Sequence, residues 1–221
     1  MHNRTLIKNA ILVNEGGSQL GSIVIEDDRI EEILIGRDVT PVLPTDSTID
    51  AEGCYLLPGV IDEHVHFRDP GLTHKADFDS ESRAAAAGGV TTVLDMPNTI
   101  PATVTAEALQ EKIERAKNLC HVNFGFFVGA TADNAHRLRQ INPSTVAGVK
   151  LFMGSSTGSL QVEDPDALLI VFEESRLPIM VHCEDTPMIT AAMKEHQARY
   201  GVDPHVRYHA TIRSAEACFK S

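Results

Sequence analysis

From Pro58 onward, short apolar segments alternate with amphipathic ones, and this alternation leaves few folds open. Strands are predicted at 59–61, 90–95, 122–128, 146–152 and 177–182, and helices at 78–87, 105–118, 131–140, 164–175 and about 187–200. The strand starts recur about every 25–35 residues, the length of a βαβ unit. Because the strands are apolar almost throughout, they predict a parallel sheet that is covered by helices.

The number of βα units indicates that the predicted fold is not complete. A closed barrel of eight units needs about 250 residues, whereas this chain has 221. It also stops inside a helix-like run at 215–221 that carries no terminating signal. We therefore predict an α/β fold in which residues 57–221 form the first part of a (β/α)8 TIM-type barrel, with the remainder beyond Ser221. A complete, smaller open sheet is the alternative.

Residues 1–56 follow a different pattern. Short runs at Thr5–Ile11, Gly21–Glu26 and Arg29–Ile35 are separated by turn-rich pieces such as the sequence NEGG at 14–17. This pattern predicts a small antiparallel, β-sandwich-like domain with a boundary near residue 56. No ligand motif is evident in it, so its expected role is structural.

The composition excludes several classes of partner. A net charge of −12 argues against nucleic acid and anionic membranes, but it does not exclude an anionic small molecule. No run approaches the roughly 18 apolar residues of a membrane span, and the first residues lack the apolar core of a signal peptide. The four cysteines are scattered without a CxxC pair, so we expect reduced, mostly buried thiols in a cytoplasmic protein.

The strongest local motif is the pair His64 and His66, which follows the first predicted barrel strand. Residues i and i+2 of a strand point to the same side, so both imidazoles are expected to face the mouth of the barrel. Chemistry in such barrels is placed at that mouth, and two imidazoles suit one divalent metal ion. A bare His-X-His motif also occurs by chance on many surfaces.

Two later strands carry groups that are compatible with a metal site. Lys150 lies in an apolar strand, where burial lowers the pKa of an amine and allows it to react with CO₂ to give a carbamate. The alternative is a lysine that extends to the rim and pairs with a carboxylate. His182 ends the fifth predicted strand, where a lone histidine is more often a hydrogen-bonded core residue. Three such strand ends in one barrel favour a two-metal hydrolytic site.

Four stretches of sequence combine these residues into longer motifs. They are PGVIDEHVHFRDPG at 58–71, RAAAAGGVTT at 83–92 running into DMPNT at 95–99, VKLFMG at 149–154, and VHCE at 181–184. Together they resemble the dihydroorotases of the amidohydrolase superfamily. The resemblance extends over nearly the whole predicted barrel portion, and the combination is highly specific.

The resemblance implies a two-metal site, usually of zinc. His64 and His66 would bind one ion, carboxylated Lys150 would bridge both, and His182 would bind the second. The family adds another histidine and a catalytic aspartate from later strands, which we expect beyond Ser221, so no general acid or base is assigned here. His205 and His209 are not used to complete the set, because they are expected to be loop or surface residues.

Two further residues match the substrate-binding groups of the family. Arg68 follows His66 by two residues, so in an extended chain it is expected on the same side as the histidines. It would bind the substrate carboxylate, and Asn98 would assist it. For Arg68 the alternative is an ion pair with Asp69 or Asp95, and for Asn98 it is a turn residue after Pro97.

The implied reaction is the reversible hydrolysis of dihydroorotate to N-carbamoyl-L-aspartate, a step of pyrimidine synthesis. The implied partner is this small molecule, and a homodimer is possible because similar enzymes are often dimers. Two alternatives stay open. One is an allantoinase or a dihydropyrimidinase-type hydantoinase, and the other is a non-catalytic, metal-free scaffold protein.

Overall fold

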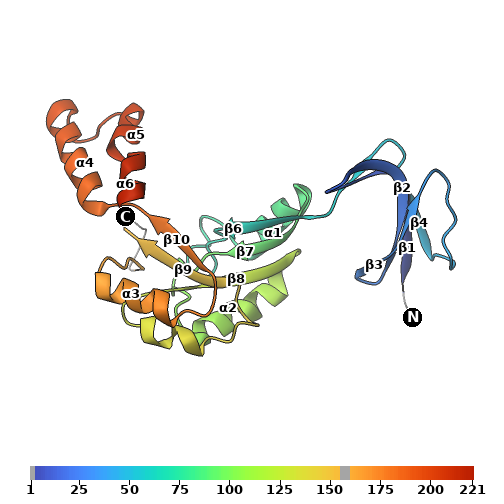
Figure 1. Cartoon of the computed structure of the whole chain (residues 1–221), viewed down its shortest axis with the longest axis horizontal. Helices are drawn as coiled ribbons and strands as arrows, with labels where there is room; N and C mark the ends of the chain where they lie inside the picture. The colour runs from blue at the N-terminus through green and yellow to red at the C-terminus, as the bar shows by residue number, and fades with distance from the viewer. Residues whose placement is uncertain (1–2, 155–159) are drawn as a thin grey trace. The chain divides into compact units, whose positions relative to one another are not determined.

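The computed structural model of the chain describes residues 3–154 and 160–221. Its contacts divide the chain into two compact units, Met1–Gly59 and Val60–Ser221 (Figure 1). The division lies a few residues after the boundary expected near residue 56.

The first unit is one mixed sheet. Its strands are β1 (Arg4–Asn14), β2 (Gly17–Glu26), β3 (Arg29–Ile35), β4 (Ser47–Asp50) and β5 (Tyr55–Leu56). The pairs β1–β2 and β2–β3 are antiparallel, as predicted, but β4 and β5 run parallel to β1. The antiparallel expectation thus holds for β1, β2 and β3 but not for β4 and β5, because the chain returns beside β1 in the same direction. All five strands belong to one sheet, so the sandwich-like arrangement is not confirmed.

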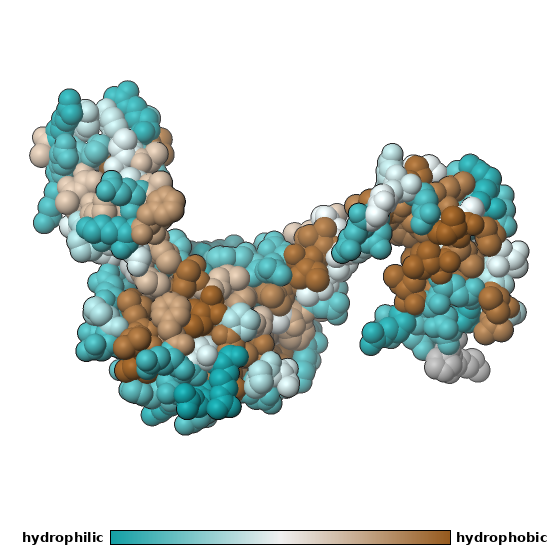
Figure 2. Space-filling view, viewed as in Figure 1, coloured by the Kyte–Doolittle hydropathy of each residue, from teal (hydrophilic) through white to brown (hydrophobic). Residues whose placement is uncertain are grey.

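Part of the surface of this unit is apolar. Figure 2 shows apolar side chains gathered on it, and exposed apolar residues occur on several of its strands. They include Ile30, Ile33, Ile35, Ile49 and Tyr55.

The second unit is built on a curled parallel sheet with the order β10-β9-β8-β7-β6 (Figure 1). Its strands are β6 (Val60–Val65), β7 (Val90–Asp95), β8 (Asn123–Gly129), β9 (Gly148–Met153) and β10 (Ile179–Cys183). The helices between them are α1 (Phe78–Ala87), α2 (Ala106–Leu119), the 3-10 helix η1 (Ala135–Gln140) and α3 (Pro165–Glu174). After β10 come α4 (Thr186–Tyr200), η2 (Val206–Tyr208), α5 (His209–Ile212) and α6 (Ala215–Lys220). Strands that follow one another in sequence are neighbours in the sheet, which is the arrangement predicted from the alternation.

Local hydrogen bonds explain where the helices begin. The Asp77 carboxylate accepts from the Ser80 amide at 2.8 Å before α1, and the Thr105 hydroxyl accepts from the Ala108 amide at 3.2 Å before α2. Both are N-caps. The helix predicted at 131–140 is wrong in its first part, because Thr131 and Asn134 bond to each other's backbone and form a turn there.

The core lies between the sheet and the helices. Val149 and Leu151 of β9 pack with Ala167 and Val171 of α3, while β7 and β8 pack in the same way against α1 and α2. Since successive side chains of a strand point to opposite faces, Lys150 faces away from these helices.

The remaining predictions on composition have mixed outcomes. All four cysteines are free, but Cys54 and Cys218 are exposed and Cys120 and Cys183 are half-buried, so the expectation of mostly buried thiols is wrong. Within the described residues, no helix is both long and apolar enough to cross a membrane. His205 and His209 are exposed, as expected.

Candidate metal centre

The two histidines of the first motif lie at the end of β6. His64 is inside the strand and His66 directly follows it. Val65, between them, packs toward the core formed with α1 and α2, so the two imidazoles lie on the other face of the sheet. Their ring centroids are 5.3 Å apart.

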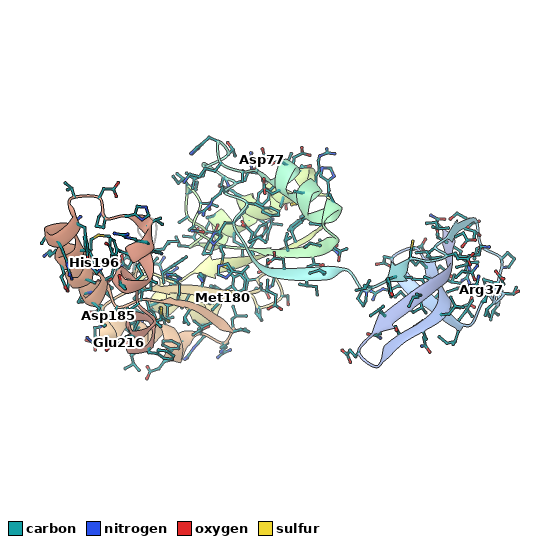
Figure 3. All side chains as sticks on the ribbon, turned by 90° about the horizontal axis from the view of Figure 1, so that it is seen from above. Arg37, Asp77, Met180, Asp185, His196 and Glu216 are labelled. Carbon is teal, nitrogen blue, oxygen red and sulfur yellow. The ribbon has the colours of Figure 1, made fainter. Side chains whose placement is uncertain are left out.

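Lys150 and His182 lie on that same face in two neighbouring strands. Lys150 is opposite Met180, which is labelled in Figure 3. His182 lies two residues after Met180 in β10, opposite Phe152, and therefore shares the face of Lys150. Lys150 is only 1% exposed, and its Nζ lies 5.0 Å from the centroid of the Phe152 ring. Within the described residues no carboxylate lies at ion-pair distance from Lys150, so the alternative of a rim lysine paired with a carboxylate gains no support.

The electrostatics indicate that three of these groups are near one another. Burial lowers the pKa of His64, the charges of Lys150 and His182 lower it further, and Asp62 opposes them. Burial also lowers the pKa of Lys150. Lower pKa values favour the neutral imidazole and the neutral amine, which are the forms that can bind a metal ion or react with CO₂.

Asn98 orients one of the histidine rings. The Nδ1 atom of His66 lies 2.8 Å from Oδ1 of Asn98, which follows β7. When Nδ1 carries the proton it donates to this oxygen, and Nε2 keeps a free lone pair. Burial lowers the pKa of His66, and the contact with Asn98 opposes this effect.

His182 makes a different contact. Its Nε2 lies 3.1 Å from Oε2 of Glu184, a buried carboxylate that Arg213 also binds. In residues 3–154 and 160–221, no three His, Cys, Asp or Glu side chains are close enough together to hold an ion. The chemistry of the His64, His66, Lys150 and His182 side chains nevertheless fits a divalent ion. The ring of His182 must turn away from Glu184 if its Nε2 is to serve as a ligand.

Arg68 lies close enough to His66 for its positive charge to lower the pKa of that imidazole, but the predicted extended chain does not explain this position. Its φ angle is +62°, so the chain is not extended there and the expected alternation from His66 does not apply. Asp69 is bound by Arg115 and Asp95 by Lys112. Neither carboxylate forms the ion pair with Arg68 that was the alternative to substrate binding.

Lys112, a buried lysine of α2, was not predicted as a functional residue from the sequence. Its side chain is fully buried against Asp95. A signal was present in the sequence, because Lys112 has helical spacing to Leu109 and Ala116, the other buried residues of α2.

Comparison with known proteins bears on this arrangement. The sequence profile described as Dihydro-orotase-like matches residues 53–164. The chain belongs to this family. The matched segment contains five of the six predicted site residues, and His182 lies outside it.

Individual relatives carry three different names within related chemistry. A dihydroorotase of Methanosarcina mazei is 37% identical over 210 residues, which cover 94% of this chain and 44% of that protein. An allantoinase of Arabidopsis thaliana is 41% identical over 147 residues, covering 62% and 28% respectively. The solved structure of an L-hydantoinase from Arthrobacter aurescens matches with a TM-score of 0.88 and 29% identity, covering 100% of this chain and 49% of that one. The chain thus spans less than half the length of these relatives.

Proposed function

We propose that this chain is the first part of the (β/α)8 barrel of a dihydroorotase, with residues 1–56 as a small structural β domain. The reaction is the reversible hydrolysis of dihydroorotate to N-carbamoyl-L-aspartate in cytoplasmic pyrimidine synthesis. The observation that carries the proposal is the placement of His64, His66, Lys150 and His182 on one face of a single parallel sheet, together with membership of the family.

The proposed cofactor is a pair of zinc ions. His64 and His66 would hold one ion and His182 the other, and Lys150, carboxylated on its amine, would bind both. When bound, such ions lower the pKa of a water molecule and polarise the carbonyl that it attacks. The chain supports this by burying Lys150, which favours the neutral amine that carboxylation requires.

The proposed substrate contacts come from the two loops that follow β6 and β7. Arg68 is not bound to either neighbouring carboxylate, so its guanidinium is available for a bidentate contact with the dihydroorotate carboxylate. Asn98 would donate a hydrogen bond from its amide Nδ2 to the substrate, while its Oδ1 accepts the hydrogen bond from Nδ1–H of His66. No residue of this chain is proposed as the general acid or base. That residue is expected in the part of the longer relatives that this chain does not cover.

The likeness to an L-hydantoinase across the whole chain supports a second candidate, a hydantoinase or an allantoinase. The three activities would use the same metal ligands and differ in substrate recognition. Hydantoin and dihydrouracil have no carboxylate for Arg68 to bind. A carboxylate on the substrate is therefore the feature that favours dihydroorotate.

Hydrolysis of dihydroorotate, allantoin and dihydrouracil by the full-length protein tests the assignment. We expect the highest kcat/KM for dihydroorotate, and a loss of about 10- to 100-fold or more in Arg68→Met through KM, because a charge-assisted contact is removed. Arg83→Met, on the exposed surface of α1, is the matched control and should be unaffected. Activity on allantoin or dihydrouracil alone would overturn the substrate assignment.

The scaffold alternative is tested by metal content. An enzyme should contain about two zinc ions per chain after addition of zinc and bicarbonate. Less than about one zinc, with no gain on that addition, would favour a non-catalytic protein.

A further inference from the structure

Lys112 and Asp95 are buried charged residues to which the proposed reaction assigns no task. Each is 1% exposed, and Nζ of Lys112 lies 2.6 Å from Oδ2 of Asp95. Lys112 also donates from Nζ to the Met96 carbonyl oxygen at 2.9 Å. Replacing a buried ion pair by apolar residues of similar volume is often neutral or stabilising, so stability alone does not explain this pair.

The pair is connected to the backbone on both sides of His66. The other carboxylate oxygen of Asp95, Oδ1, accepts from the amide of Phe67 at 2.8 Å. The amide of Met96 donates to the Val65 carbonyl oxygen at 3.0 Å. With the contact between the His66 ring and Asn98, residues at and just after the end of β7 bind His66 and the backbone of both its neighbours in the chain.

The two carboxylate oxygens are bound in different ways. Oδ2 forms the ion pair with Nζ of Lys112 at 2.6 Å. Oδ1 accepts the hydrogen bond from the Phe67 amide. Burial lowers the pKa of Lys112, whereas Asp95, and more weakly Asp69, oppose this and favour the charged amine.

We propose that Asp95 is a positioning residue for His66, and that Lys112 is the counter-charge that lets the Asp95 carboxylate be buried there. Asp95 fixes the Phe67 amide, and the imidazole of His66 is thereby held where it can bind a metal ion. This rests on the proposed function insofar as His66 is taken as a ligand.

Two double variants of the full-length protein separate positioning from stability. Asp95→Leu/Lys112→Met replaces the buried ion pair with apolar side chains of similar volume, a change that folded proteins often tolerate, but removes the acceptor for the Phe67 amide. Asp95→Asn/Lys112→Met also removes both charges but keeps an acceptor oxygen at Oδ1. Lys117→Met breaks an exposed ion pair with Glu114 on the same helix and is the control.

Three quantities are measured for each variant: the thermal unfolding temperature, the affinity for Zn²⁺ by chelator competition, and hydrogen exchange of the Phe67 amide in the metal-free protein. We expect the Leu/Met variant to bind Zn²⁺ about 10- to 100-fold more weakly, the range seen when groups that orient a ligand are lost. Its Phe67 amide should exchange faster. The Asn/Met variant and Lys117→Met should stay close to wild type in both.

A folded Leu/Met variant with unchanged zinc affinity and unchanged Phe67 exchange overturns the proposal. A folded Asn/Met variant that loses zinc affinity also overturns it, because that variant retains the acceptor oxygen. If the Leu/Met variant does not fold, the Asn/Met variant alone tests the proposal. Failure of the proposed function has a different result. The wild-type protein would then bind no zinc, and exchange of the Phe67 amide alone would decide whether Asp95 holds this backbone.

Discussion

Lys150 is an ionisable side chain that is buried without a counter-charge among the described residues, which is unfavourable unless the amine is neutral or modified. It is almost fully buried, lies near the Phe152 ring, and has no carboxylate partner within the described residues. A buried amine without a counter-charge is costly, whereas a carbamate that binds metal ions would use this position. The apolar strand around Lys150 could be predicted from the sequence. The lack of a nearby carboxylate among the described residues could not, because it depends on the side chains of the other strands.

Replacing Lys150 by Met should separate stability from activity. Met has a similar volume and carries no charge, so the metal-free protein should unfold at the same or a higher temperature than wild type. The loss of a ligand should reduce kcat/KM by about 100-fold or more. Unfolding curves and assays on the full-length protein test this. Clear destabilisation with normal activity would show that Lys150 has a structural role.

Local patterns predicted some side chains well and others for the wrong reason. The alternation at His64 and His66 holds because Val65, between them, packs into the core. The same argument fails at Arg68, where the backbone adopts a positive φ angle. Lys112 was missed because a lysine in an amphipathic helix is usually solvated, and its burial depends on Asp95 of a neighbouring strand.

The secondary structure elements were predicted more completely than their pairing. Strands and helices with strong apolar patterns and caps, such as α1 and β7, have the predicted bounds. The turn at Thr131 and Asn134 replaced part of a predicted helix, because side-chain bonds to the backbone compete with helix formation. The parallel pairing of β4 and β5 with β1 depends on long-range contacts that periodicity does not encode.

The cap of α1 gives a prediction on pH. Hydrogen bonding to the Ser80 amide holds the pKa of Asp77 below its usual value of 3.8. A lowered carboxylate pKa adds stability above the unfolded-state pKa, and this stability is lost as the pH falls through the folded-state value. Asp77→Ala should therefore be less stable than wild type at pH 7, and the difference should shrink below about pH 4.

Urea unfolding between pH 7 and pH 3 measures this effect. Asp77→Asn is the matched control, because an asparagine can cap the helix without titrating. Its difference from Asp77→Ala should vary little with pH. A difference between wild type and Asp77→Ala that persists undiminished at pH 3 would show that the charge of Asp77 is not responsible.

The parallel sheet as a whole has two edge strands, β6 and β10, in the part of the chain that the structure describes. Apolar residues are exposed on both, including Val60 at 54%, Ile61 at 59% and Val181 at 42%. Exposed apolar edges are normally protected in natural proteins. The proposed closed barrel accounts for this exposure, since further strands would cover both edges.

The central claim is that imidazoles from β6 and β10 and the modified amine of β9 share a pair of ions. A crystal structure of the full-length protein grown with zinc and bicarbonate, with anomalous diffraction measured at the zinc edge, tests it most directly. The account predicts two anomalous peaks, one beside His64 and His66 and one beside His182, with density for a carbamate on Lys150 between them. Zinc bound elsewhere, or these four side chains pointing away from any shared ion, would contradict it.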